Sequence, residues 1–526
     1  MRSLNAALFL PLLPLAIAYG CGGDEHVATP KFEDPDASEH EPDSGPEVEP
    51  EAPTVVPGSK ERFVLHGTIV TPDTIVEGIV LVEGANITCV GTEDECGGEL
   101  GAEGATIVYT KGIIAPGLID THNHILFDIF DNDDWVPEKV YTNHNDWTLE
   151  KRYQAMLDVK QCLVNDSQGK PTWCTSTPYG TAAGSLRCEV DKFGELKGLI
   201  AGTTSIVGLP GTSSQCFSSV ARSIDLAQNG IDAPDKIQTS ALFPPAKSAL
   251  DGVCANFADM STDAYLIHVG EGTDAPSLAE FDKFLSIATD PLCIASPKTT
   301  ITHGTAFTQQ QFATMGQAGM KLTWSPQSNV SLYQATTNIP LALDANVTVA
   351  LGPDWSMGGS QNMLDELRFA KKYSDDNWSA RLSAKDIVTM ATTNGAAAIG
   401  LGDKIGSIKK GMLADLVVIA KDRKKPYEGI LEARPKDVRL VMIGGTIAYG
   451  DRVLEEAAPT EPGCEKIDIC GVDKFLCVAL ATSENKLDQT YATIQQALTQ
   501  ALQSADSLTP EDGWNFAPLP PLVKCD

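Results

Sequence analysis

Four short segments of this chain end an apolar run with residue types that bind metals or carry protons. The first contains His122 and His124, two histidines separated by one residue. In an extended strand, positions i and i+2 point to the same side, so the two imidazoles would chelate one ion together. The other segments supply His268 with Glu271, then His303, then Asp354. Three imidazoles and a carboxylate suit Zn²⁺ or another borderline divalent ion.

Such a set of ligands predicts a hydrolytic centre. A metal ion with an open coordination position lowers the pKa of bound water towards about 7, which yields hydroxide at neutral pH. Glu271 could donate or accept a proton beside the ion. Each residue also has a structural interpretation: His303 as a buried histidine, Glu271 as a surface acid, Asp354 as a helix N-cap. Their shared position at strand ends favours catalysis, because barrel active sites are built there.

The elements that must position these residues alternate between strand and helix. Alternation of this kind predicts a parallel sheet with right-handed crossovers. We expect helices at 277–285, 308–315 and 362–370. We expect strands at 113–121, 203–208, 237–243, 264–269, 300–303, 321–325 and 347–352, with an eighth around 219–225.

Strand-rich segments flank this middle part on both sides. The first has short alternating strands between 62 and 91, and the second has them between 406 and 450. We expect the two to form one composite β-sandwich. The expected division is a signal peptide (1–20), an acidic tether (21–60), the composite sandwich (61–111 and 404–452), the barrel (112–403) and a cysteine-containing extension (453–526).

A long insertion, 127–198, interrupts the barrel directly after His124. It carries Trp135, Tyr141, His144 and Trp147, and a loop of this length in a compact domain is usually functional. A substrate lid and a disulfide-stapled decoration are both open interpretations. His144 could touch substrate, although a lone histidine in a loop is more often structural. In the C-terminal extension, one helical stripe (Leu487, Tyr491, Ile494, Leu498, Leu502) predicts a helix that packs on the body.

The N-terminus predicts export. Arg2 precedes an apolar run from Leu4 to Ala18 that two prolines interrupt, which is typical of a signal peptide. Cys21 after Gly20 resembles a lipoprotein cleavage site, so we expect a lipid anchor at Cys21, periplasmic or on the cell surface and in the outer membrane. Cleavage after Ala18, giving a secreted soluble protein, is the alternative.

The bulk composition limits the partners. The formal net charge of the 526 residues is -31, which argues against nucleic acid as a partner. Residues 22–59 contribute eleven of the acids and one lysine, so much of that charge is local. Twelve cysteines besides Cys21 fit disulfides in an exported chain. Close spacing suggests Cys89 with Cys96, and pairing within Cys464, Cys470, Cys477 and Cys525.

With these residues in view, the chain resembles the amidohydrolase superfamily, in the branch of cytosine, guanine and triazine deaminases and hydrolases. The resemblance runs from about Arg62 to Asp451. The motifs that carry it are 116–124 (PGLIDTHNH), 202–204 (GTT), 268–271 (HVGE), 302–304 (THG), 324–329 (WSPQSN), 351–355 (LGPDW) and 411–417 (GMLADLV). The resemblance implies a distorted (β/α)8 TIM-like barrel with an accessory β-sandwich.

The resemblance also implies roles for the site residues. His122, His124, His268 and Asp354 match the metal ligands of the family. His303 matches the histidine that orients the attacking water or polarises the scissile group. Glu271 matches the acid that protonates a ring or amide nitrogen, while Asp354 shuttles a proton to the leaving amine. Glu271 favours one divalent ion, Zn or Fe, over a two-metal centre bridged by a carboxylated lysine, for which Lys236 and Lys247 are the nearest residues.

The sequence therefore predicts a metal-dependent hydrolase of carbon–nitrogen bonds other than peptide bonds, acting on small cyclic amides, amidines or aminated heterocycles through a metal-bound hydroxide. One departure is Trp355, which follows Asp354 where the family often has glycine and would narrow the pocket. Hydrolysis of another bond (ester, dipeptide or carbon–halogen) and a binding or scavenging lipoprotein on a silent barrel are the alternatives.

Overall fold

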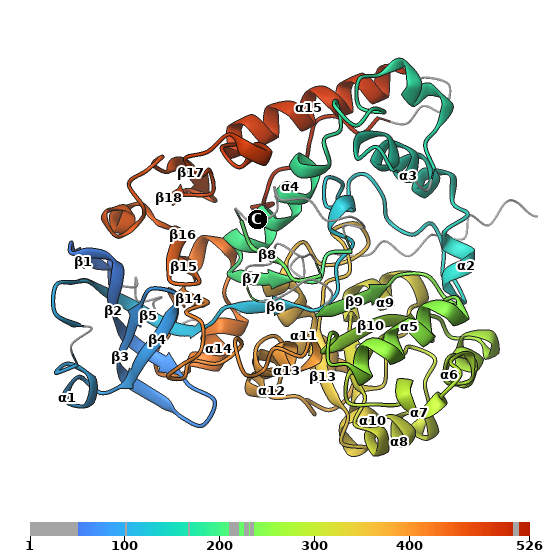
Figure 1. The fold of residues 1–526 in the computed structure, drawn as a ribbon, viewed down its shortest axis with the longest axis horizontal. Coiled ribbons are helices and arrows are strands. Elements are labelled where there is room, and N and C mark those ends of the chain that lie inside the picture. The colour runs from blue at the N-terminus through green and yellow to red at the C-terminus, as the bar shows by residue number, and fades with distance from the viewer. Residues whose placement is uncertain are drawn as a thin grey trace, which may run out of the picture. The chain divides into compact units, whose positions relative to one another are not determined.

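Eight short strands, paired in parallel, form the framework of the middle of the chain (Figure 1). The computed structural model describes residues 51–99, 102–166, 169–209, 220–225, 231, 236–508 and 515–525, and every count below refers to these residues. The strands lie in two sheets, ordered β6-β7-β8 and β13-β12-β11-β10-β9. They are β6 (Leu118–Asp120), β7 (Thr203–Ile206), β8 (Arg222–Ser223), β9 (Ile237–Ser240), β10 (Ala264–Val269), β11 (Thr299–His303), β12 (Lys321–Trp324) and β13 (Thr348–Leu351).

The two parallel sheets meet where β6 and β13 end. Asn123 and Asp354 form a parallel bridge there, and the Thr121 N–H donates to the Leu351 carbonyl at 3.2 Å. Each strand predicted for the barrel is present, including the short β8 within 219–225. The result is a mixed α/β fold with parallel sheets, consistent with a TIM-like barrel.

Helices connect these strands as predicted, and local sequence determines where they begin. Asp274 caps α6 by accepting a hydrogen bond from the Ser277 N–H, and Thr308 with Gln311 forms a capping box on α8. The helices associated with the barrel are α4 (Arg187–Ile200), α5 (Lys247–Ala258), α6 (Ala275–Ile287), α7 (Pro291–Ile294), α8 (Gln309–Ala318), α9 (Pro326–Tyr333), α10 (Ile339–Asp344), α11 (Met363–Asn377), α12 (Ala384–Met390) and α13 (Thr393–Ala398).

The flanking segments share one sheet, which brings the two ends of the described chain together. Its path is β17-β18-β16-β15-β14-β5-β2-β3-β4, with β1 also paired to β5. β5 and β14 join the two halves in antiparallel register, with Pro116 opposite Leu416. The strands are β1 (Thr54–Val56), β2 (Ser59–Val70), β3 (Ile75–Glu83), β4 (Asn86–Gly91), β5 (Ala105–Pro116), β14 (Leu416–Ile419), β15 (Val438–Ile443), β16 (Thr446–Asp451), β17 (Glu465–Ile469) and β18 (Val472–Leu476).

The sheet extends beyond both boundaries expected for it. β1 and the start of β2 lie inside the predicted tether 21–60, and β17 and β18 lie inside the predicted extension 453–526. β1 pairs with β5 and β18 pairs with β16, so backbone hydrogen bonding carries the sheet past the compositional borders. Strands of both flanks contribute to one apolar core, including Leu65, Val80, Leu416 and Leu440. The short helices α1 (Glu93–Cys96) and α14 (Pro426–Leu431) complete the flanks. A second facing sheet, as in a sandwich, stays a prediction.

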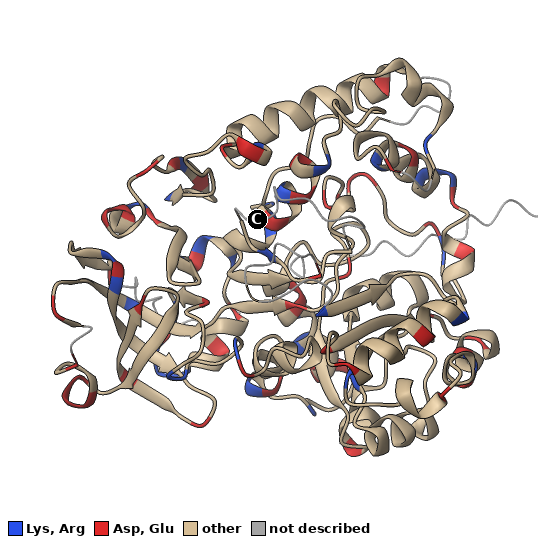
Figure 2. Cartoon of the chain, viewed as in Figure 1, with Lys and Arg blue, Asp and Glu red and all other residues tan. Residues whose placement is uncertain are grey.

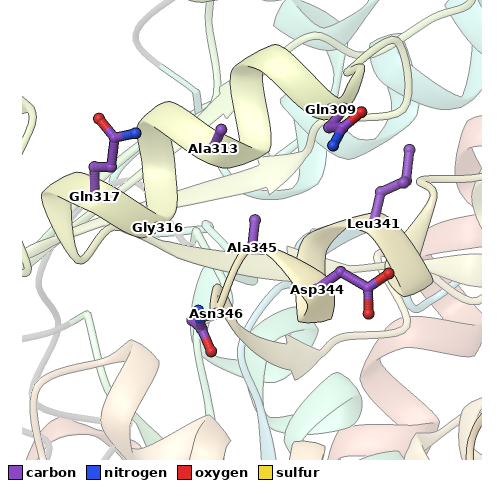
Figure 3. Close-up of a pocket in the computed structure, with 8 residues that line it drawn as sticks. All are labelled: Gln309, Ala313, Gly316, Gln317, Leu341, Asp344, Ala345 and Asn346. Carbon is purple, nitrogen blue, oxygen red and sulfur yellow. The ribbon is translucent and has the colours of Figure 1, made fainter.

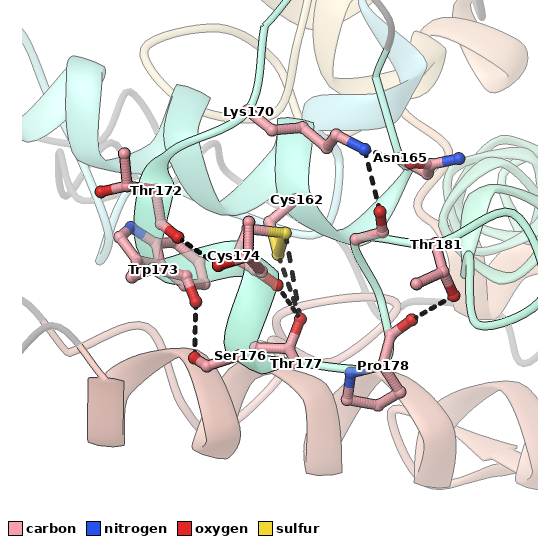
Figure 4. Close-up of a disulfide and its surroundings, with 12 residues drawn as sticks. Cys162, Asn165, Lys170, Thr172, Trp173, Cys174, Ser176, Thr177, Pro178 and Thr181 are labelled. Carbon is pink, nitrogen blue, oxygen red and sulfur yellow. Dashed lines mark hydrogen bonds between the residues drawn. A yellow bond between two sulfur atoms is a disulfide. The ribbon is translucent and has the colours of Figure 1, made fainter.

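The insertion 127–198 is helical and cross-linked. It contains α2 (His144–Trp147) and α3 (Lys151–Leu163), and a disulfide joins Cys162 to Cys174 (Figure 4). Its last part, α4, is almost wholly buried and is the crossover helix between β6 and β7. The range 127–198 given to the insertion thus also takes in most of this crossover helix.

The C-terminal extension packs on this insertion. Within α15 (Tyr491–Leu508), Ile494, Leu498 and Leu502 are buried as the stripe predicted, and Figure 2 draws the helix almost entirely as uncharged. Lys486 Nζ lies 2.7 Å from the Glu189 carboxylate on α4, and Lys524 Nζ lies 3.0 Å from Asp131. The suggested disulfides are confirmed as Cys89–Cys96, Cys464–Cys477 and Cys470–Cys525, and Cys254–Cys293 is a further one.

The structure describes the chain from residue 51 onward. The predicted signal peptide, Cys21 and most of the tether lie outside the described residues. Among the helices described, none combines the length and apolar character needed to cross a membrane.

Candidate metal and catalytic site

The predicted site residues all stand at the C-terminal ends of the parallel strands. His122 and His124 follow β6, His268 lies in β10 and Glu271 follows it, His303 ends β11, and Asp354 follows β13. The strands β10, β11 and β13 are almost entirely buried, which fixes their ends against the sheet. Because parallel strands end on the same side of the barrel, these six residues meet in space.

The imidazoles form one compact group. The ring of His122 lies 5.0 Å from that of His124, 4.6 Å from His268 and 5.1 Å from His303, measured between centroids. Nitrogen atoms of His122, His124 and His268 lie within 4.8 Å of one another, and so do ligand atoms of His122, His303 and Asp354. Asp354 Oδ1 lies 2.9 Å from His122 Nε2 and 3.5 Å from His124 Nε2.

One buried nitrogen atom in this group fits a metal ion. His268 Nε2 is enclosed and has no hydrogen-bond partner among the described residues. His268 Nδ1 lies 3.2 Å from the Ser240 carbonyl, so Nδ1 carries the proton and Nε2 keeps its lone pair. A buried polar atom without a partner costs free energy, and a metal ion at this point would remove that cost.

Burial keeps the candidate ligands in the protonation states that a metal needs. It lowers the pKa of His124 to about 3 and the pKa of His268 well below its usual value, so these imidazoles are neutral at pH 7. Burial alone would raise the pKa of the Asp354 carboxyl, but the imidazoles of His122, His303 and His124 lower it below its usual value. The carboxylate is therefore ionised.

Asp354 is held tightly by its surroundings. Ser328 Oγ donates a hydrogen bond to its Oδ2 at 2.5 Å. Its backbone has φ of 76°, and that of His303 has φ of 70°, in the left-handed region that few residues other than glycine adopt. Conformations of this kind persist where the surroundings enforce them and are common at functional sites. The loop at the end of β13 therefore aims one particular oxygen at the histidines.

Glu271 and His303 form a second pair beside the imidazole group. Glu271 Oε2 lies 3.8 Å from His303 Nε2, and both side chains are buried. Asn329 Nδ2 contacts His303 Nδ1 at 3.1 Å, and its own Oδ1 accepts from Thr336, which assigns the amide nitrogen to His303. His303 thus accepts at Nδ1 and presents Nε2–H towards the acid.

Aromatic side chains from the insertion close the site on its other side. Trp355 lies 5.7 Å from the His124 ring and 5.1 Å from Trp147, between ring centroids. The other aromatic neighbours of Trp355 are Phe127, Trp135 and Tyr153. Trp355 is 2% exposed and packs beside His124, and the narrowing of the substrate pocket by this side chain stays a prediction.

Other residues considered from the sequence lie outside the group. His144 Nε2 lies 3.6 Å from Glu280 Oε1, which makes it a structural contact at the rim. Lys236 pairs with Asp263 and Lys247 with Asp251, so both ammonium groups are engaged elsewhere. A surface depression between α8 and α10 contains none of the predicted site residues, and Asp344 is the one ionisable residue that lines it (Figure 3).

Comparison with known proteins agrees with this geometry. A family model described as "Amidohydrolase family" matches residues 249–448, which contain His268, Glu271, His303 and Asp354. The 5-methylthioadenosine/S-adenosylhomocysteine deaminase of Desulforamulus reducens is 27% identical over 432 residues, covering 75% of this chain and 95% of that protein. Residues 249–448 therefore match the amidohydrolase family, and the chain is similar to the deaminase-like branch of that superfamily.

Another relative of this chain is also named as a deaminase of an adenosine derivative. The 5'-deoxyadenosine deaminase of Methanosarcina mazei is 24% identical over 445 residues, covering 76% of this chain and 96% of that protein. Two solved structures share its fold. The atrazine chlorohydrolase mutant of Arthrobacter aurescens, complexed with zinc and atraton, has a TM-score of 0.56 at 17% identity, covering 76% of this chain and 96% of that one. Escherichia coli guanine deaminase has a TM-score of 0.52 at 16% identity, covering 76% and 99%.

Several residues that contact the site residues could not be assigned a role from the sequence. Ser328 and Asn329 lie in the motif WSPQSN, which the resemblance included without giving either a role. Tyr333 and Ser240 carry no local signal, because a hydroxyl or a carbonyl near a site is set by the fold alone. Trp147 was noted only as part of the insertion.

Proposed function

We propose that the protein is a metal-dependent hydrolase that cleaves carbon–nitrogen bonds in small cyclic amides, amidines or aminated heterocycles. The observation that carries the proposal is the meeting of His122, His124, His268 and Asp354 from separate strand ends, with ligand atoms in overlapping groups within 4.8 Å. Relatives named as deaminases of adenosine derivatives support an aminated heterocycle as the substrate.

One divalent ion, Zn or Fe, would be held by His122, His124, His268 and Asp354. It would supply a Lewis acid that lowers the pKa of a coordinated water towards neutrality. Zinc is favoured by the imidazole-rich ligand set and by the zinc in the related atrazine chlorohydrolase structure.

The remaining groups would handle protons and orient the substrate. Glu271 would protonate the ring or amide nitrogen of the substrate, because its Oε2 faces the histidine group. His303 would orient the attacking water or polarise the scissile group through Nε2–H. Asp354 would pass a proton to the leaving amine, and its hydrogen bond from Ser328 keeps its second oxygen occupied meanwhile.

We also propose the domain division and the location of the chain from the sequence. An accessory β-sandwich would be completed around the sheet that β5 and β14 join. The N-terminal sequence supports export and a lipid anchor at Cys21. A Cys21→Ser variant found in the soluble fraction, with the unaltered protein in the membrane fraction, would support the anchor, whereas both in the soluble fraction would support the secreted alternative.

The experiment that tests the proposed function joins metal content to ammonia release. The purified protein is measured by elemental mass spectrometry, and ammonia is followed with 5'-methylthioadenosine, 5'-deoxyadenosine, guanine, an amino-triazine and hydantoin. Hydantoin releases no ammonia, so its ring opening is followed by absorbance. We expect about one metal ion per chain, absent from a His122→Ala, His124→Ala double variant, and turnover of at least one compound.

Three other outcomes would point elsewhere. About two ions per chain would contradict the one-metal site. One ion per chain, with turnover only of an ester, a dipeptide or a halogenated ring, would show that the enzyme cleaves a bond other than the proposed carbon–nitrogen bond. Binding of a compound without product under any metal condition would favour the scavenging lipoprotein.

A further inference from the structure

A chain of two hydrogen bonds runs from the insertion to the proposed acid. Trp147 Nε1 lies 2.9 Å from Tyr333 Oη, and Tyr333 Oη lies 2.7 Å from Glu271 Oε1. All three side chains are buried. Trp147 belongs to α2 in the insertion, Tyr333 ends α9, and Glu271 follows β10, so three separate parts of the chain meet in these contacts.

The direction of both hydrogen bonds is fixed by chemistry. An indole N–H can only donate, so Tyr333 Oη must accept from Trp147. The hydroxyl proton of Tyr333 is then directed at Glu271. Burial and the neighbouring Glu271 carboxylate raise the pKa of Tyr333 well above its usual value, so the hydroxyl keeps that proton.

This arrangement distinguishes the two oxygens of Glu271. Oε1 is occupied by the hydroxyl of Tyr333, whereas Oε2 faces His303 at 3.8 Å. A proton delivered to a substrate nitrogen must then leave from Oε2, the oxygen on the side of the imidazole group. Without Tyr333, the carboxyl could rotate and present either oxygen.

The insertion also forms backbone hydrogen bonds with the residues around Glu271. The His144 N–H donates to the Glu271 carbonyl at 3.3 Å, and the Thr273 N–H donates to the Thr142 carbonyl at 2.7 Å. Asn143 Nδ2 donates to Asp274 Oδ2 at 2.7 Å. Segment 142–147 is therefore fastened to segment 271–274 at both backbone and side-chain level.

We propose that Trp147 is a positioning residue for the reaction, which acts through Tyr333 to hold Glu271 with Oε2 directed at the substrate. The inference rests on the proposed function, in which Glu271 is the acid. It makes segment 142–147 of the insertion part of the working site, and not merely a cover over it.

The test is a double-mutant cycle with a matched control. Trp147→Phe and Tyr333→Phe each keep an aromatic ring; the first removes the hydrogen bond to Tyr333, and the second removes both hydrogen bonds of the chain. Trp173→Phe is the control, since Trp173 lies in the same insertion, next to the Cys162–Cys174 disulfide, and packs on the apolar core. Each variant is made alone and in a Glu271→Gln background, and kcat, KM and metal content are measured with a compound that the protein turns over.

We expect Trp147→Phe to lower kcat about ten-fold and Tyr333→Phe about thirty-fold, with KM and metal content nearly unchanged. In the Glu271→Gln background, both should change kcat by less than about two-fold, because the group they position is already altered. Trp173→Phe should stay within about two-fold throughout. Equal losses with and without Glu271, or an equal loss in Trp173→Phe, would overturn the inference and leave a general packing role.

A structural measurement separates this inference from the proposed function. In a crystal structure of Trp147→Phe, we expect Tyr333 Oη to lie beyond hydrogen-bond distance from Glu271 Oε1. An unchanged contact would overturn the positioning role even if the protein is an active hydrolase. A broken contact in a protein that turns over no compound would sustain the positioning of Glu271 while the proposed function fails.

Discussion

Buried carboxyl groups on the two sides of the site differ in their protonation. On the strand-end side, the pKa of Asp354 lies below its usual value, because neighbouring imidazoles outweigh the effect of burial. On the insertion side, burial raises the pKa of Asp128 to about 6 and that of Asp191 to about 8. Asp191 is as fully enclosed as Asp354, so enclosure by itself does not decide ionisation.

This difference in pKa reflects two kinds of surroundings, one that stabilises a negative charge and one that favours close packing. A carboxylate surrounded by imidazoles is ready for a cation, whereas a fully enclosed acid can be more stable in its protonated form even with basic residues nearby. Asp128 lies in the insertion and Asp191 in the crossover helix α4, and the basic residues that act on them are Lys197 for Asp128 and Arg187 and Lys192 for Asp191. Trp147 of the insertion is connected to the Glu271 side chain through Tyr333.

The largest expected effect is that of removing the charge on the strand-end side. Asp354→Asn keeps the shape of the side chain and should lower kcat by at least about 10³-fold, since both metal binding and proton transfer lose their carboxylate. The melting temperature should fall by no more than the loss of the metal ion causes, about 5–10 °C. Asp344→Asn, at an exposed acid that pairs with Arg381, is the control and should keep full activity. Near-normal turnover in Asp354→Asn would contradict the proposed chemistry.

Removing the metal should weaken the same side without altering the insertion. A chelator should lower the melting temperature by about 5–10 °C, because an ion that binds only the folded state adds its binding free energy to stability. Added Zn²⁺ should restore the original value. The His122→Ala, His124→Ala variant should show no response to the chelator in the same calorimetric scan. A chelator response in that variant would place the ion elsewhere.

A smaller effect is expected from loosening the insertion. Replacing both Cys162 and Cys174 by serine removes the bridge of Figure 4 and should lower the free energy of unfolding by about 2 kcal/mol. We expect kcat/KM to fall by less than about ten-fold, with faster proteolysis between 163 and 186. The matched control replaces Cys89 and Cys96, a bridge in the flanking sheet, and should leave kcat/KM unchanged. Equal kinetic losses in both variants would contradict a link between the insertion and the site.

The smallest effect should appear in stability alone. The pKa of Asp191 is raised in the folded state, so its contribution is fully present below about pH 4 and is lost as the pH rises to about 8. Asp191→Asn removes this titration and should gain at least about 1 kcal/mol relative to the unaltered protein between pH 4 and pH 8. Urea unfolding at both pH values measures the gain. A pH-independent difference would show that Asp191 is ionised in the folded protein.

The sequence predicted the strand-end side better than the insertion side, for a physical reason. His122, His268, His303 and Asp354 each stand beside a buried apolar strand, so local pattern alone places them at one end of a barrel. Trp147 contacts Tyr333 across 186 residues, and no periodicity encodes such a contact. The predicted insertion 127–198 also included most of α4. The burial of the lysines and acids of this helix depends on partners far away in the chain, which the local sequence does not show.

The pairing of β5 with β14 means that β5 lacks this neighbour for part of the time in which the chain is synthesised. Ile113 and Ala115 of β5 pair with Ile419 and Val417 of β14, about 300 residues later, while β1 covers only Ile107–Tyr109 of that edge. At roughly 5–20 residues per second, about 15–60 s pass before the partner strand exists. During this interval an apolar strand edge presents unpaired backbone groups, which can pair with another nascent chain. The burden on chaperones during production of this protein should therefore fall on residues 113–116, far from the catalytic end of the barrel.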